Sequence, residues 1–160
     1  MGMIVKLVNI TLLAAFFFSQ TPEWRAECSD ELKAAACGIT VEEFDLLSRV
    51  VEAESDRGTS EDSFEGRTLI ALTVLNRVSS ADFPDSIYGV CHQSGQFAVV
   101  SSGAIYSIRR TDLSDEAVVE AFRRVIEGNY PNVMYFNNSC YQYGSAYGVY
   151  GGNYFVTVEE

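Results

Sequence analysis

The residue best placed for chemistry is a glutamate at the end of an otherwise apolar helix face. Glu54 lies seven residues after Leu47, so at about 100° per residue it returns to nearly the same angle around the predicted helix. A carboxyl group held on an apolar face is desolvated, which favours its neutral form and raises its pKa. A general acid that works near neutral pH needs a pKa raised in this way. The spacing therefore makes Glu54 a candidate proton donor.

Two other interpretations of Glu54 stay open on the sequence alone. In one, it is an exposed residue at a frayed helix end. In the other, it forms an ion pair with Arg49, Arg57 or Arg77. Glu52 is predicted to point well away from the apolar face, so a neutral substitution there is expected to be nearly silent.

The other reactive side chains give less support to other reaction classes. His92 is the single histidine of the chain, whereas a zinc amidase or peptidase with a His-x-x-Glu-His motif needs at least two imidazoles. Cys91 precedes it directly, and neighbours in an extended segment point to opposite faces, which disfavours a Cys/His pair. The sequence has no G-x-S-x-G elbow and no phosphate-binding glycine loop. We expect no metal and no cofactor.

Four cysteines are compatible with an exported chain that carries disulfides. They are Cys28, Cys37, Cys91 and Cys140. The expected pairing joins the first to the second and the third to the fourth, because this arrangement keeps one bridge local. Four free thiols are the alternative.

Length and charge bound the kind of protein. The 160 residues are enough for one globular domain, with 48% hydrophobic and 21% charged residues. The net charge of −11 gives no attraction for nucleic acid or anionic lipid. Nucleic acid is therefore not an expected partner.

The N-terminus has the pattern of a secretory signal. Lys6 precedes the apolar run over residues 7–18, and a polar stretch follows. The run is too short for a bilayer span, which needs about 20 residues. We assign residues 1–26 to a signal or an N-terminal anchor and residues 27–160 to the domain, and a buried N-terminal helix is the other alternative. The expected location is secreted or in the cell envelope, with membrane contact only if this segment stays uncleaved.

The sequence after the signal predicts helices first. A short helix is expected over residues 29–38. The T-x-x-E capping box of Thr40 and Glu43 starts the next helix at Val41, and this is the helix that ends in the candidate acid. Residues 64–78 are apolar on more than one side, which is typical of a helix in the centre of a domain.

The second half predicts one more long helix and then a sheet. Ser114 is expected to cap a helix that stops at Gly128, with Leu113 and Val118 as a hydrophobic staple. Two aromatic and β-branched segments are expected to pair as strands, on either side of a Gly/Tyr-rich stretch: 133–138 and 151–158. The fold class is therefore α+β, with helices first and a small antiparallel sheet late.

Seven segments follow one another in a recognisable order. They are LLSRVVEAES, FEGRTLIALTVLNRV, FPDSIYGV, QSGQFAVVSSG, VIEG, VMYFNN and GGNYF. Together they resemble the cell wall hydrolase family of SleB type, the spore-cortex-lytic catalytic domain. The resemblance covers about residues 44–156. Its most specific parts are the E-G-x₈-L-N-R-V block, from Glu65 to Val78, and the Q-F pair that follows.

The resemblance implies a lysozyme-like, resuscitation-factor-like α+β fold and cleavage of the glycan strands of peptidoglycan. It places the catalytic glutamate at the end of the helix before the E-G block, which is Glu54 here. Asp56 and Glu65 are weak candidates for the second carboxylate of an ordinary glycosidase. A single acid is what the resemblance implies for a lytic transglycosylase, which closes a 1,6-anhydro-muramyl ring and needs no metal.

A supporting groove for the glycan is expected from amide and aromatic side chains, which suit hydroxyl groups and sugar faces. Its predicted members are Gln96, Phe97, Tyr135, Asn137, Asn153 and Tyr154. Core packing is the alternative for Phe97 and Tyr135. Two competing functions stay open: a non-catalytic glycan-binding wall or spore protein, and an N-acetylmuramoyl-L-alanine amidase, which the single histidine disfavours.

The chain departs from the family pattern at two places. The loop between Glu54 and the E-G block is longer than the usual Ala-Arg-Gly-Glu-Pro-Tyr run. Tyr154 follows Gly152 and Asn153 where members commonly have histidine. Both departures concern the surroundings of the glutamate, which is itself retained.

Overall fold

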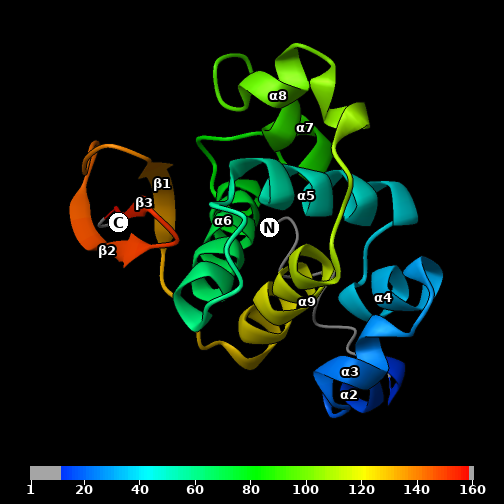
Figure 1. Ribbon diagram of the computed structural model, residues 1–160. Coiled ribbons are helices and arrows are strands. Elements are labelled where there is room, and N and C mark those ends of the chain that lie inside the picture. The colour runs from blue at the N-terminus through cyan, green and yellow to red at the C-terminus, as the bar shows by residue number, and fades with distance from the viewer. Residues whose placement is uncertain (1–11, 159–160) are drawn as a thin grey trace.

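The computed structural model describes residues 12–158, which fold into eight α-helices, one 3-10 helix and three strands (Figure 1). In chain order these are α2 (Leu12–Phe18), α3 (Pro22–Ala26), α4 (Asp30–Cys37), α5 (Val41–Glu54), α6 (Glu61–Ser79), α7 (Ile87–His92), α8 (Ala98–Ser101), η1 (Ala104–Ser107), α9 (Asp112–Glu127), β1 (Val133–Asn137), β2 (Ser145–Tyr150) and β3 (Asn153–Thr157). Within this part of the chain, none of the helices combines the length and the apolar character that a membrane crossing needs.

The helix α6 is the central element of the domain. Every residue from Gly66 to Val78 is buried, and the helix contacts α5, α7, α9, β1 and β2. In Figure 1 it lies between the sheet on one side and α5 and α9 on the other. Its apolar side chains point in several directions, so they are buried only if neighbours pack all around the helix. The expectation of a central helix is confirmed.

Local capping signals set the starts of α4 and α5. Ser29 caps α4, and the helix ends at Gly38 in the left-handed conformation, with φ 72°. Thr40 Oγ1 accepts a hydrogen bond from Glu43 N at 3.1 Å, and Glu43 Oε2 accepts one from Thr40 N at 3.0 Å. The capping box is complete, so α5 begins at Val41 as predicted.

The predicted cap of α9 is wrong by three residues. Thr111 is the N-cap: its Oγ1 accepts from Ser114 N at 3.2 Å, and Ser114 Oγ accepts from Thr111 N at 3.0 Å. Two capping residue types stand three apart here, and their reciprocal bonds let the helix begin at Asp112. Leu113 and Val118 are therefore residues inside the helix and not a staple around its cap.

The late sheet has three antiparallel strands in the order β1-β3-β2. The predicted pairing of segments 133–138 and 151–158 is confirmed: they form β1 and β3, with Asn137 opposite Tyr154. The strand β2 is an addition: it lies in the Gly/Tyr-rich stretch and pairs with β3 from Ser145 to Tyr150. Helices first and a small sheet late is the predicted α+β architecture.

All four cysteines are free, so the expected disulfide pairing is wrong. Cys28 precedes the eight-residue helix α4 and Cys37 ends it, and a helix of that length spans roughly 12 Å, beyond the reach of a disulfide. Cys91 is buried in α7, whereas Cys140 is exposed. Burial raises the pKa of the Cys91 thiol to about 12, which makes it a poor nucleophile at neutral pH.

Residues 12–26, part of the segment assigned to a signal or anchor, pack against the domain. The helix α2 contacts α4, and α3 contacts α9. Phe17 is fully buried in the core, and Arg25 Nε donates to Glu116 of α9 at 3.0 Å. Residues 1–11 of the expected signal lie outside the described residues. Export by this segment stays a prediction.

Candidate active site

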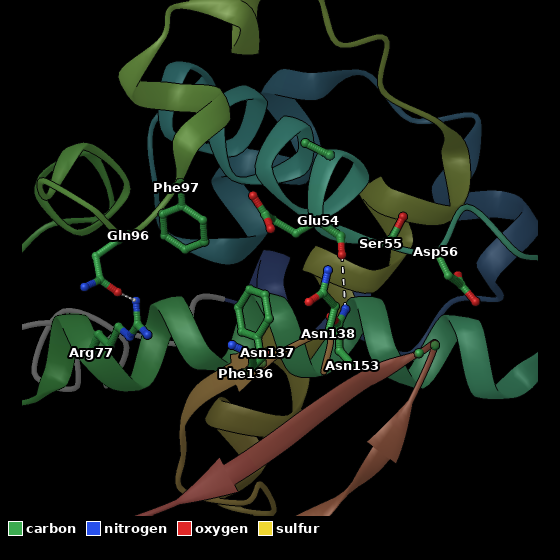
Figure 2. A pocket seen from close by; sticks show the side chains of 13 residues that line it. Glu54, Ser55, Asp56, Arg77, Gln96, Phe97, Phe136, Asn137, Asn138 and Asn153 are labelled. Carbon is green, nitrogen blue, oxygen red and sulfur yellow. Dashed lines mark hydrogen bonds between the residues drawn. The ribbon is translucent and has the colours of Figure 1, made fainter. Parts of the chain in front are cut away.

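Glu54 is the last residue of α5 and lines a cleft of about 540 Å³ between the helices and the sheet. Figure 2 shows it between Phe97 on one side and Asn138 and Asn153 on the other. The complete lining is Ala53, Glu54, Ser55, Asp56, Arg77, Gln96, Phe97, Phe136, Asn137, Asn138, Gly151, Gly152 and Asn153. Segments from five parts of the chain therefore meet at the end of α5.

The Glu54 carboxyl group is half-buried, and this desolvation raises its pKa above the ordinary value of 4.5. Within the described residues its side chain has no hydrogen bond and no ion pair to offset the burial. The expected arginine partners are engaged elsewhere or exposed: Arg49 pairs with Asp45 at 2.7 Å, and Arg77 donates to Met134 O at 2.9 Å. The ion-pair interpretation is wrong, and so is that of a fully exposed helix end.

The sheet holds the backbone at the end of α5 in place. Asn153, the first residue of β3, is buried and donates from Nδ2 to the Glu54 carbonyl oxygen at 3.1 Å (Figure 2). The last carbonyl groups of a helix have no partner within the helix, so this bond satisfies one of them. A residue 99 positions later in the chain thus fixes the point from which the Glu54 side chain projects.

Glu52 was expected only to point away from the apolar face of α5, but the structure shows that it is also buried. Its side chain is 9% exposed. The carboxylate accepts a hydrogen bond from Thr111 Oγ1 at 2.7 Å and lies 4.0 Å from Arg67 Nε. The reason is that α5 is covered on two faces, by α6 and by the start of α9, and helical periodicity alone reveals only one.

The loop after Glu54 is held by polar contacts within the loop and with the first two turns of α6. Arg67 of α6 is 2% exposed and donates from Nη1 to Gly58 O at 2.7 Å. Asp56 accepts from Gly58 N at 2.9 Å and from Ser63 Oγ at 2.8 Å. Asp56 therefore lines the cleft with one carboxylate oxygen bonded to the loop and the other to Ser63 at the start of α6.

The other weak candidate for a second carboxylate lies away from the cleft. Glu65 forms two hydrogen bonds with Arg124 of α9, at 2.8 and 2.6 Å. It is absent from the lining of the Glu54 cleft. This charge-assisted pair fastens α6 to α9 and has no part in the cleft's chemistry.

Arg77 organises the wall opposite the loop. It donates from Nη1 to Gln96 Oε1 at 2.8 Å (Figure 2). Its guanidinium carbon lies 5.2 to 6.0 Å from the ring centres of Phe83, Phe97 and Tyr135, a distance at which a cation is attracted to an aromatic face. Because arginine can only donate, the carbonyl oxygen of Gln96 must face it, which leaves the Gln96 NH₂ group free to donate to a ligand.

Four of the six predicted groove residues line the Glu54 cleft with it, and two do not. Those that do are Gln96, Phe97, Asn137 and Asn153. Tyr154 follows Asn153 on β3, so its side chain leaves the other face of the strand, where its ring packs 5.1 Å from that of Tyr141. Tyr135 packs beneath Arg77 and lines a neighbouring cleft instead.

Other lining residues were missing from the sequence-based set. Arg77 is the arginine of the L-N-R-V motif, so the motif itself was the available signal. Gly151 and Gly152 form the turn between β2 and β3. Ser55, Phe136 and Asn138 are neighbours of predicted members and carry no separate signal.

The lone histidine and its neighbour lie outside the cleft. The His92 ring stacks on Tyr88 at 3.8 Å, and its Nδ1 lies 2.9 Å from Tyr88 O. In residues 12–158, no group of three or more His, Cys, Asp or Glu side chains is arranged to hold a metal ion. The polar side chains that line the cleft are the carboxyl groups of Glu54 and Asp56, the hydroxyl group of Ser55, four amides and the guanidinium group of Arg77.

The fold and the cleft define a class: a helix-rich α+β domain with one half-buried glutamate between helix ends and a small sheet. Residues 61–155 match the Cell Wall Hydrolase family. This is more than half of the chain, and the protein belongs to that family. Glu54 lies seven residues before the matched segment, so its assignment depends on the geometry of the cleft.

Named relatives and solved structures agree with the family. The chain is 33% identical over 103 residues to a spore cortex-lytic enzyme of Oceanobacillus iheyensis. The aligned segment covers 63% of this chain and 34% of that protein. It is 34% identical over 84 residues to one of Bacillus subtilis, covering 52% and 26%. The chain thus spans about a third or less of the length of these relatives.

Two solved structures have the same fold. One is the catalytic domain of the Bacillus cereus SleB protein, with a TM-score of 0.59, 26% identity, and coverage of 74% of this chain and 91% of that one. The other is the catalytic domain of the germination-specific lytic transglycosylase SleB from Bacillus anthracis, with a TM-score of 0.60, 26% identity, and coverage of 75% and 98%. The predicted α+β fold is confirmed.

Proposed function

We propose that this chain cleaves the glycan strands of peptidoglycan as a lytic transglycosylase, with Glu54 as its acid and base. The observation that carries the proposal is the Glu54 carboxyl group, which is half-buried in the cleft without a partner and has a raised pKa. Such a group holds its proton closer to neutral pH than an exposed glutamate does, as a general acid must. Membership of the Cell Wall Hydrolase family supports the choice of substrate.

The proposed reaction needs no second carboxylate and no water. Glu54 donates its proton to the glycosidic oxygen, and the bond from that oxygen to C1 of N-acetylmuramic acid breaks. The Glu54 carboxylate then takes the proton of the muramyl 6-hydroxyl group while O6 bonds to C1, which closes the 1,6-anhydro ring and restores the acid. Both carboxylate oxygens of Asp56 accept hydrogen bonds, from Gly58 of the loop and from Ser63 of α6, which supports this route over hydrolysis.

Secretion or envelope location belongs to the same proposal, because peptidoglycan lies outside the cytoplasmic membrane. The apolar run after Lys6 supports export. A non-catalytic glycan-binding protein remains the competing function, and activity distinguishes the two. Neither a metal nor a cofactor takes part in the proposed steps.

Glu54→Gln is the direct test of the acid. The amide keeps the shape of the side chain but cannot give up a proton in the reaction, so lysis of purified walls in a zymogram should fall at least about 100-fold, the lower range for general acid catalysis. Glu42→Gln is the matched control, because Glu42 is exposed in the first turn of the same helix. Equal loss in both variants, or unfolding of the Glu54 variant, would show that the carboxyl group is structural.

A further inference from the structure

A second cleft of about 510 Å³ adjoins the Glu54 cleft. Four residues line both clefts: Arg77, Gln96, Phe136 and Asn137. The two hollows are therefore parts of one groove, which runs from the end of α5 across the Gln96 wall. The second part continues to the segment between β1 and β2, where Gln142 and Tyr143 complete it.

The lining of the second cleft suits a neutral, hydroxyl-rich ligand. It has three amide side chains, Gln96, Asn137 and Gln142, and two tyrosines. No carboxylate is among its lining residues, although the chain has a net charge of −11. Its one charged group, Arg77, already donates to Met134 O and Gln96, so neither a cationic nor an anionic ligand is favoured.

Tyr143 has the features of a contact platform in this cleft. It is 77% exposed, and it is one of two non-glycine residues in the described part of the chain with a positive φ, here 68°. A positive φ is uncommon for a bulky residue. Because the Tyr143 ring is exposed, packing of the ring in the core does not explain this conformation. Its ring centre lies 5.6 Å from that of Tyr135, at an interplanar angle of 51°, so the two rings form a partly open aromatic corner.

We propose that the second cleft is a binding subsite for additional sugar units of the glycan strand cut at Glu54, with Tyr143 stacking on a sugar face and Gln96 and Gln142 binding its polar groups. The proposal rests on the proposed function, because the continuity of the groove identifies the occupant. A strand that lies in the Glu54 cleft and continues past Gln96 enters the second cleft without leaving the protein surface.

The test measures binding, in protein with the Glu54→Gln substitution so that no ligand is cut. Soluble β-1,4-linked N-acetylglucosamine oligomers of increasing length, from the disaccharide to the octasaccharide, are titrated by calorimetry. Affinity should rise with length until both clefts are filled. Tyr143→Ala should remove that rise, lowering the affinity for long oligomers roughly two- to tenfold, as expected for one aromatic contact, and should leave short oligomers unaffected.

Two further variants make the result specific. Tyr143→Phe keeps the aromatic face and should keep the rise of affinity with length. Tyr106→Ala removes a tyrosine that is equally exposed, at 74%, but lies in η1 and lines neither cleft, so it should bind as the parent does.

The outcomes separate this proposal from the proposed function. If Tyr143→Ala weakens all lengths equally, or none, the second cleft is not a subsite, and cleavage at Glu54 is untouched by that result. If no oligomer binds at any length, the subsite proposal is wrong, and wall lysis by the parent protein then decides the proposed function separately.

Discussion

Replacing Gly66 by alanine sets two effects of similar size against each other. Gly66 lies inside α6, where alanine stabilises a helix by roughly 0.5–1 kcal/mol relative to glycine. A Cβ atom at this position would lie 2.9 Å from Tyr150 O and 3.2 Å from Gly151 Cα, both of them backbone atoms of the β2–β3 hairpin. Forcing extra volume into a packed site costs about 1–3 kcal/mol. The clash should win, and the free energy of unfolding should fall by about 1 kcal/mol.

The same clash should reduce activity, because the hairpin turn borders the candidate active site. Gly151 and Gly152 line the cleft, and Asn153 donates to the Glu54 carbonyl oxygen. Moving the turn away from α6 shifts that donor and loosens the end of α5. Urea unfolding followed by circular dichroism measures the stability, and wall lysis measures the activity. A Gly66→Ala protein that is at least as stable as the parent and equally active would refute the close approach as the reason for glycine.

Three further predictions concern buried or positioned charges. The pKa of Glu54 is raised in the folded state, so the folded protein binds this proton more tightly than the unfolded chain does. The resulting contribution to the free energy of unfolding is complete below about pH 4.5 and is lost as the pH rises through the folded pKa. Glu54→Gln should therefore unfold at higher urea than the parent at neutral pH and at the same urea below pH 4.5; equal midpoints at both would contradict the desolvation. Glu52→Gln should destabilise the protein, because it removes the negative charge beside the buried Arg67. The free energy of unfolding in urea should fall by about 1–3 kcal/mol, and an unchanged unfolding midpoint would contradict this prediction. Arg77→Lys lacks the planar fork that reaches two acceptors, so it should raise the KM for soluble glycan more than it lowers kcat, and an unchanged KM would show that the orientation of Gln96 does not matter.

Local signals in the sequence predicted the elements that carry the site. The capping box at Thr40 and the apolar run through Glu54 gave the bounds of α5, because both signals act within one or two helical turns. The apolar circumference of residues 64–78 gave the central position of α6. The signals for these features lie within short stretches of the sequence, although the burial of α6 itself is completed by other elements.

Features that depend on which elements meet could not be predicted from the same signals. Glu52 is buried because α9 and Arg67 cover a second face of α5, and the periodicity of one helix does not reveal its neighbours. The strand β2 is different, because a local signal for it was present and was missed. That signal is the Gly151-Gly152 pair, whose φ values are 52° and 74°. Two glycines with positive φ between extended segments are typical of a tight hairpin turn.

The candidate acid was predicted, but its surroundings were predicted only in part. Tyr154 was chosen for its place next to Asn153, and strand alternation sends the two side chains to opposite faces. Arg77 was missed as the group that orients Gln96, because its contact spans 19 positions of sequence.

Mass analysis of the muropeptides released from purified peptidoglycan tests the central claim most directly. If Glu54 acts alone, every cut strand should end in a 1,6-anhydro-muramyl residue, lighter by one water than a hydrolysis product, and digestion in ¹⁸O-labelled water should leave these ends unlabelled. Reducing ends that carry solvent ¹⁸O would contradict the claim, because they would mean that a second group activates water.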